Sequence, residues 1–182
     1  MQSLRVKRKG ALLLSFSLSS MLFAAPLASA VAQGSSVSGS SVSVSTVTGS
    51  FGEKLTVSTS TVSKPQEVLV SGKGFDETVG IYLAYCVVPK KGDVPTPCGG
   101  GVNKAGTGDA SYWISSNPPP YGVGLAKPFQ AGGRFTYKVA VTKKIGSVDC
   151  QKVRCAITVR SDHLHQGDRT HDLFIPITFK KN

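Results

Sequence analysis

Apolar and polar residues alternate with a period of two through most of the chain after residue 54, which predicts short β-strands rather than helices. In the run at 80–88, Ile81, Leu83 and Tyr85 fall on one face, and Tyr82, Ala84 and Cys86 fall on the other. Seven such runs are separated by turn residues, at 55–62, 67–75, 80–88, 110–115, 134–141, 155–160 and 173–179. Seven short strands predict an all-β fold, an antiparallel β-sandwich, in a single domain over residues 54–182.

The last two runs predict a β-hairpin. Cys155, Ile157 and Val159 fall on one face of the first strand, and the second strand, at 173–179, is more apolar. Pro176 has no backbone N–H to donate, so this second strand is expected at a sheet edge or beside a bulge. The residues 161–171 between the two runs form a long polar tip.

The N-terminus has the organisation of a secretory signal peptide. A basic stretch from Arg5 to Lys9 precedes an apolar stretch at 11–25, and small residues then suit cleavage after Ala30 or Ala32. An uncleaved anchor is the alternative, but the apolar stretch is shorter than the roughly 20 residues that cross a bilayer. Residues 1–32 are therefore predicted to be removed, which places the mature protein outside the cell or in its envelope.

Residues 33–53 are rich in Ser, Gly, Val and Thr and are expected to form a flexible linker. Its Val42, Val44 and Val47 could let part of it pair as an edge strand.

The chain is basic, and it keeps a positive net charge after the signal peptide is removed. It holds 21 Lys and Arg against 10 Asp and Glu, and the loss of four basic residues leaves 17 against 10, a net charge of +7. This charge favours peripheral contact with an anionic membrane or wall polymer by non-specific steering. No basic stripe with interleaved aromatic residues is present, so specific nucleic-acid binding is not expected.

Four cysteines in an exported all-β domain indicate two disulfides. Closeness in the sequence favours Cys86–Cys98 and Cys150–Cys155, each closing a short loop. Zinc is the alternative for the Cys150/Cys155 pair, whose spacing lies at the edge of the structural-site range.

The segment Val148-Asp149-Cys150, with Cys155 after four residues and then a strand, a polar loop and a terminal strand, resembles the neocarzinostatin family. The strand that carries Cys86, followed after a short loop by Cys98, also fits the family. The resemblance covers residues 54–180. The segments GIYLAYCVVP, YWISSNPP and YGVGLAKPF and the pair Asp162-His163 resemble more closely a related group of modules. These modules occur in secreted actinobacterial envelope proteins, and some of them accompany haem-uptake domains.

The resemblance implies a seven-stranded immunoglobulin-like sandwich that binds and does not catalyse. In the chromoproteins of this family a cleft beside one sheet holds an apolar enediyne. By position, Cys86–Cys98 would lie near the cleft floor and residues 161–171 would flank its mouth. The long Pro/Gly-rich connection at 115–129 and the His-rich tip depart from the family pattern and would reshape or fill this cleft.

Candidate residues for contact with a ligand or partner gather around the same two loops. Aromatic side chains bury a large area at low entropic cost. Trp113 and Phe129 could equally be core residues. The candidate contact residues are Tyr112, Trp113, Asn117, Tyr121, Phe129, Asp162, His163 and His165.

His163, His165 and His171, with nearby aspartates, are weak candidates for a Zn²⁺ or Cu²⁺ site or an axial haem ligand. A polar tip needs no metal, because Asp162 and Asp172 can pair with Arg160 and Arg169. No cofactor is therefore expected.

No catalytic motif such as G-x-S-x-G or H-E-x-x-H is present, so the chain is not expected to be an enzyme. The first hypothesis is a binding module that contacts an envelope protein or glycan, as an accessory subunit in one version. The alternatives are a small-molecule carrier of the chromoprotein type and a haem- or metal-binding module. A carrier should have an open apolar cleft, whereas an interaction module should have a filled cleft and an exposed aromatic patch.

Overall fold

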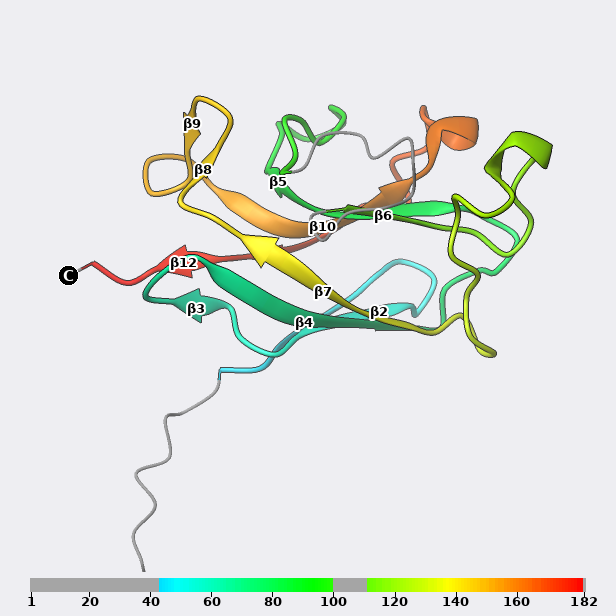
Figure 1. The fold of residues 1–182 in the computed structure, drawn as a ribbon, viewed down its shortest axis with the longest axis horizontal. Coiled ribbons are helices and arrows are strands. Elements are labelled where there is room, and N and C mark those ends of the chain that lie inside the picture. Colours follow the sequence, from blue (N-terminus) through cyan, green and yellow to red (C-terminus); the bar gives the residue numbers. More distant parts are fainter. Residues whose placement is uncertain (1–42, 100–110, 182) are drawn as a thin grey trace, which may run out of the picture. The chain divides into compact units, whose positions relative to one another are not determined.

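Two four-stranded antiparallel sheets form the fold in the computed structural model, which describes residues 43–99 and 111–181 (Figure 1). The first sheet has the order β1 (Ser45–Thr48), β2 (Lys54–Val57), β4 (Gln66–Lys73) and β7 (Phe135–Val141). The second has the order β11 (Leu173–Pro176), β10 (Cys155–Ser161), β5 (Ile81–Val87) and β6 (Ser111–Ile114). The predicted antiparallel β-sandwich is confirmed.

Two short strand pairs and two single turns of 3₁₀-helix complete the described elements. β3 (Thr61–Val62) pairs in parallel with β12 (Thr178–Phe179), and β8 (Lys144–Ile145) pairs with β9 (Val148–Asp149). The 3₁₀ turns are η1 (Pro120–Gly122) and η2 (His163–His165). Among the described residues, no helix has the length and apolar character needed to cross a membrane.

The core lies between the two sheets and follows the predicted alternation. Leu55, Val70 and Val139 of the first sheet and Leu83 and Ile157 of the second are fully buried in one apolar cluster. Their neighbours in sequence point away from this cluster, so each sheet has an inner face and an outer face. Binding sites on the sheets must therefore lie on their outer faces.

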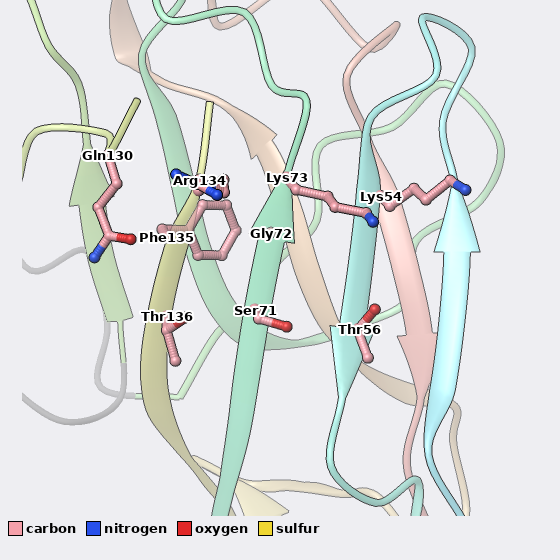
Figure 2. Close-up of a pocket in the computed structure, with 9 residues that line it drawn as sticks. All are labelled: Lys54, Thr56, Ser71, Gly72, Lys73, Gln130, Arg134, Phe135 and Thr136. Atoms are coloured by element: carbon pink, nitrogen blue, oxygen red, sulfur yellow. The ribbon is translucent and has the colours of Figure 1, made fainter. Parts of the chain in front are cut away.

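Gly72 leaves room for a buried aromatic ring from the neighbouring strand. Gly72 lies opposite Phe135 in the register of β4 and β7, and a Cβ at Gly72 would come 2.1 Å from Cε1 of the Phe135 ring (Figure 2). Phe135 is buried and contacts the rings of Phe75, Phe129 and Tyr137. Only a residue without a side chain fits beneath this ring.

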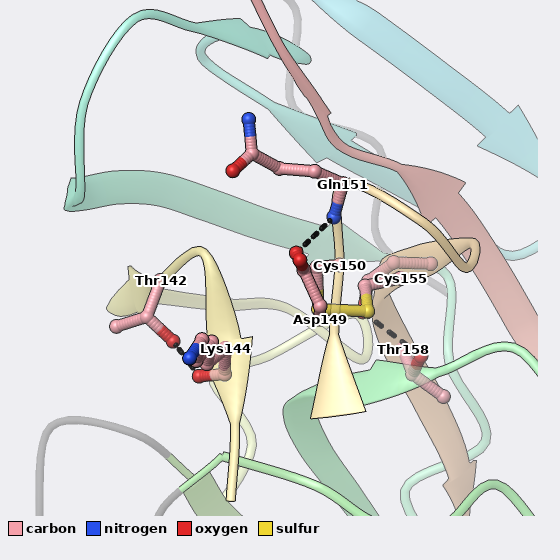
Figure 3. Close-up of a disulfide and its surroundings, with 8 residues drawn as sticks. Thr142, Lys144, Asp149, Cys150, Gln151, Cys155 and Thr158 are labelled. Atoms are coloured by element: carbon pink, nitrogen blue, oxygen red, sulfur yellow. Dashed lines mark hydrogen bonds between the residues drawn. A yellow bond between two sulfur atoms is a disulfide. The ribbon is translucent and has the colours of Figure 1, made fainter. Parts of the chain in front are cut away.

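Both predicted disulfides are present. Cys86–Cys98 joins the end of β5 to a chain segment that continues the β6 edge, where the Gly99 N–H donates to the Tyr85 carbonyl at 2.7 Å. Cys150–Cys155 closes the loop that leads into β10 (Figure 3). In that loop Asp149 Oδ1 accepts from the Gln151 N–H at 2.9 Å, which fixes the turn between the two cysteines. Loops of these lengths stabilise the fold by roughly 2–3 kcal/mol each through the unfolded chain.

The observed elements differ from the predicted ones in four places, one of which is the β8–β9 pair, which none of the seven predicted runs contains. β1 lies inside the segment 33–53 that was expected to be a linker, and it occupies the edge position foreseen for Val47. The predicted strand at 55–62 divides into β2 and β3, and the run at 173–179 divides into β11 and β12. β11 is an edge strand, as Pro176 predicted.

Candidate functional site

The outer face of the second sheet has a floor of small residues. Ala84, Ala156 and Thr158 lie side by side on β5 and β10, and Cys86 pairs with Ala156 in the register. Their inward neighbours Leu83 and Ile157 belong to the core, so these four side chains point the opposite way. All four are nonetheless buried by the chain itself, which means that this floor is closed to solvent.

One end of this floor carries four rings that we call the aromatic–histidine cluster: Tyr82, Trp113, Tyr121 and His163. Tyr82 and Trp113 are directly opposite each other on β5 and β6. The His163 ring lies 5.0 Å from Trp113 in a T-shaped arrangement, and Tyr121 stacks on Trp113 at 6.4 Å between ring centroids. Such geometries are favourable beyond the area they bury.

His163 is held at both ring nitrogens by tyrosine hydroxyls. Tyr82 Oη lies 2.5 Å from Nδ1, and Tyr121 Oη lies 2.7 Å from Nε2. Which of the two hydroxyls donates depends on the tautomer of the His163 ring. The loops that carry η1 and η2 are thereby joined through one side chain.

Asp162 is the buried support of this cluster. Its side chain is 0% exposed, its Oδ2 accepts from Trp113 Nε1 at 3.0 Å, and its Oδ1 accepts from the Leu164 N–H at 3.0 Å. A Cβ on Gly80 would come 2.0 Å from Oδ2, so glycine is required beside the carboxylate. Asp162 therefore fixes both the indole orientation and the start of η2.

The Pro/Gly-rich connection between β6 and β7 packs over the indole. Lys127 donates its backbone N–H to the Trp113 carbonyl at 2.8 Å, and a Cβ on Gly122 would come 2.4 Å from Cη2 of Trp113. Trp113 is only 4% exposed as a result. This loop brings Tyr121 onto the cluster from the solvent side.

Apolar side chains are exposed around the cluster. Tyr121 is 60% exposed, Val123 72% and Leu164 49%, and they come from the two loops that the Tyr121–His163 contact joins. They are three of the seven large apolar side chains that are exposed in the described part of the chain. We call these three residues the apolar patch.

Charges beside the cluster are partly desolvated. The Arg160 guanidinium lies 5.1 Å from the centre of the Tyr82 ring, a cation–π contact. Burial raises the pKa of Tyr82, as does the charge of Asp162, and burial lowers the pKa of Arg160. Tyr82 is therefore a neutral hydrogen-bonding group at physiological pH.

A second buried charge group lies at the base of the same hairpin. Arg169 Nη1 donates to Asp172 Oδ2 at 3.3 Å. Burial raises the pKa of Asp172 to about 6, while Arg169 and Arg160 act in the opposite direction. Of the expected pairings, that of Asp172 with Arg169 is present, whereas Asp162 accepts from Trp113 and from the Leu164 N–H instead of an arginine.

The structure brings Trp113, Tyr121, Asp162 and His163 together out of the candidate contact residues. Two others lie on the core side: Tyr112 stacks on Tyr137 at 4.2 Å, and Phe129 packs against Phe75 and Phe135. Asn117 donates to the Thr78 carbonyl at 3.4 Å, and His165 lies 3.5 Å from Asp162 Oδ1.

His171 lies apart from the cluster. Its ring is 5.0 Å from that of Phe51, and its Nε2 is 3.6 Å from Asp168 Oδ2. Within residues 43–99 and 111–181, no three His, Cys, Asp or Glu side chains converge in a way that could hold a metal ion.

Sequence reasoning missed Tyr82, Gly80 and Gly122. In the sequence Tyr82 lies on the outward side of a strand, and its partner His163 is 81 residues away. Their contact could not be predicted because the sequence does not give the register of β5 with β10, which places Arg160 opposite Tyr82.

Comparison with known proteins gives one similarity of fold. No family model matches the chain, and no curated protein matches it. The structure is similar to a solved structure of macromomycin, with 21% sequence identity and a TM-score of 0.45, over 70% of this chain and 99% of that one.

Proposed function

We propose that the chain is an exported, non-enzymatic binding module that contacts a protein of the cell envelope through the apolar patch of Tyr121, Val123 and Leu164. The observation that carries the proposal is the combination of a closed floor with exposed apolar side chains on the two loops that the Tyr121–His163 contact joins. Exposed apolar groups set on a buried hydrogen-bonded framework are typical of protein interfaces.

Preorganisation supports this function. The Tyr121 ring is held by stacking on Trp113 and by its bond to His163, so little side-chain entropy remains to be lost on binding. Aromatic residues in such positions dominate the energetics of protein interfaces.

The test is site-directed photocrosslinking in the secreting host. A photoreactive residue at Val123 should give one discrete envelope adduct, and Tyr121→Ala should reduce its yield about tenfold or more. The matched control is Leu69→Ala, which removes an exposed apolar side chain from the outer face of the first sheet. Equal yields from Tyr121→Ala and the control would refute the patch as the contact surface.

A small-molecule carrier is the second candidate, and the floor of Ala84, Ala156 and Thr158 beside Cys86–Cys98 favours it. Small side chains leave depth for a ligand if the residues that cover them move aside. Native mass spectrometry with an absorbance spectrum of the protein from its own host tests this candidate. A retained chromophore would favour the carrier function over the function of an interaction module.

A further inference from the structure

The outer face of the first sheet is the face that points away from the core. It carries two rows of polar side chains. In the register of β2 and β4, Lys54 is opposite Lys73 and Thr56 is opposite Ser71. In the register of β4 and β7, Ser71 is opposite Thr136. One further step of this register places Arg134 beside Lys73. A row of three cations thus lies next to a row of three hydroxyls.

These rows line a shallow pocket of about 370 Å³ (Figure 2). Gln130 completes its wall, because the Gln130 and Arg134 backbones exchange hydrogen bonds of 2.7 and 2.9 Å and keep the two side chains adjacent. Lys54, Lys73 and Arg134 are all exposed. The pocket therefore offers charged, amide and hydroxyl donors over one continuous surface.

The cations of this pocket have no acidic neighbour among the described residues that line it. On the same sheet Glu67 pairs with Lys138, and near Arg134 the Glu77 carboxylate accepts from the N–H groups of Gly132 and Gly133. Like charges directly opposite on neighbouring strands are destabilising. An anion bound between Lys54 and Lys73 would relieve that repulsion.

We propose that this face, the cationic row of Lys54, Lys73 and Arg134 with its hydroxyl row, binds an anionic polyhydroxyl polymer, a chain of sugar or polyol units that carries phosphate or carboxylate groups. A guanidinium donates two parallel hydrogen bonds to either group, and the hydroxyls and the Gln130 amide match the hydroxyls of the polymer. Neighbouring strands are about 4.8 Å apart, so the row spans roughly 10 Å, which suits successive anionic groups of a polymer.

A polymer fits this surface better than a bilayer does. Insertion into a membrane interface requires apolar side chains beside the basic ones. The exposed apolar side chains beside this face, Leu69 and Val44, do not line the pocket, and the one aromatic ring that lines it, Phe135, is buried. The site is separate from the aromatic–histidine cluster, so it is independent of the function proposed above.

The experiment compares two triple variants of the exported protein that remove equal charge. Lys54→Gln/Lys73→Gln/Arg134→Gln removes the cationic row. Lys152→Gln/Arg154→Gln/Lys180→Gln, also at exposed positions, is the control. Binding is measured at several salt concentrations to polyglycerol phosphate, polygalacturonate and neutral dextran. Vesicles with 30% phosphatidylglycerol and duplex DNA are the competing probes.

The cationic-row variant should bind the anionic polymers at least tenfold more weakly than the parent protein, with a shallower salt dependence, and the control should stay within about threefold. The comparison of polyglycerol phosphate with polygalacturonate assigns the anion. Equal losses in both variants, tighter binding to vesicles or DNA, or equal binding to dextran would overturn the proposal. An unchanged unfolding midpoint confirms that both variants fold.

Discussion

At the scale of single residues, Asp162 joins a strand to the turn that follows it. The variant Asp162→Ala leaves the buried Trp113 Nε1–H and the part-buried Leu164 N–H without their acceptor. A buried donor without a partner costs about 1–3 kcal/mol and a part-buried one less, so we expect a loss of about 2–4 kcal/mol in the free energy of unfolding. Urea unfolding measures it, followed by the fluorescence of Trp113, the only tryptophan.

The control for this change is Asp93→Ala, which removes an exposed carboxylate. It should alter stability by no more than about 0.5 kcal/mol. If both variants unfold at the same urea concentration, the carboxylate of Asp162 is not a structural support, and the rigidity of the aromatic–histidine cluster has another origin.

Asp172 is expected to make stability depend on pH. Its pKa is raised from the ordinary 3.8 to about 6 by burial, and Arg169, Arg160, Asp168 and His171 are the charged or titratable groups around it. The folded state therefore binds this proton more tightly than the unfolded chain does. The resulting stabilisation is complete below pH 3.8 and is lost as the pH rises through about 6.

The variant Asp172→Asn isolates this contribution, because other titrating groups are common to both proteins. The stability of the parent protein relative to the variant should fall as the pH rises from 4 to 7, measured by urea unfolding at fixed salt. A difference that stays constant over this range would show that Asp172 titrates alike in both states.

At the scale of elements, the contact of β4 with β7 depends on Gly72. In an ordinary strand position Gly→Ala is favourable, because it lowers the entropy of the unfolded chain. Here the added methyl group would overlap the Phe135 ring, which is buried and packed against other aromatic rings. We expect Gly72→Ala to destabilise the protein by about 1–3 kcal/mol in thermal or urea unfolding.

Gly167 provides the matched control, since a Cβ there meets no atom within 4 Å. Gly167→Ala should be neutral or slightly stabilising. A stabilising Gly72→Ala would mean that β4 and β7 can separate without cost.

The elements also show how far the sequence alone leads. Alternation predicted which side chains of β5 and β10 face the core, because a half-buried strand repeats every two residues. It could not divide the run at 55–62. β3 leaves the sheet of β2 because Thr178 donates its N–H to the Ser60 carbonyl at 2.9 Å, a partner more than a hundred residues away.

The candidate site was predictable in part for the same reason. Trp113, Tyr121, Asp162 and His163 stand out as aromatic, acidic and histidine residues in loops or beside them. Phe129 looks equivalent in the sequence, yet the loop that carries it turns the ring towards Phe75 and Phe135. Which rings face solvent depends on loop conformation, which hydrophobic periodicity does not encode.

At the scale of the whole molecule, the two proposed surfaces belong to different sheets. The apolar patch lies beside β6 and the η2 turn, on the second sheet, whereas the cationic row lies across β2 and β4 on the outer face of the first. Because the core fills the space between the sheets, neither surface overlaps the other. The protein could then hold a partner against an anionic polymer.

This arrangement predicts independent binding at the two surfaces. Tyr121→Ala should leave binding to polyglycerol phosphate within about twofold of the parent protein, and the cationic-row variant should retain its envelope crosslink. Distant sites without shared partners are additive in free energy. On a surface coated with polyglycerol phosphate, only the protein with both surfaces intact should recruit the crosslinked partner, as measured by surface plasmon resonance. Competition between polymer and partner for the same protein would instead show that one surface serves both ligands.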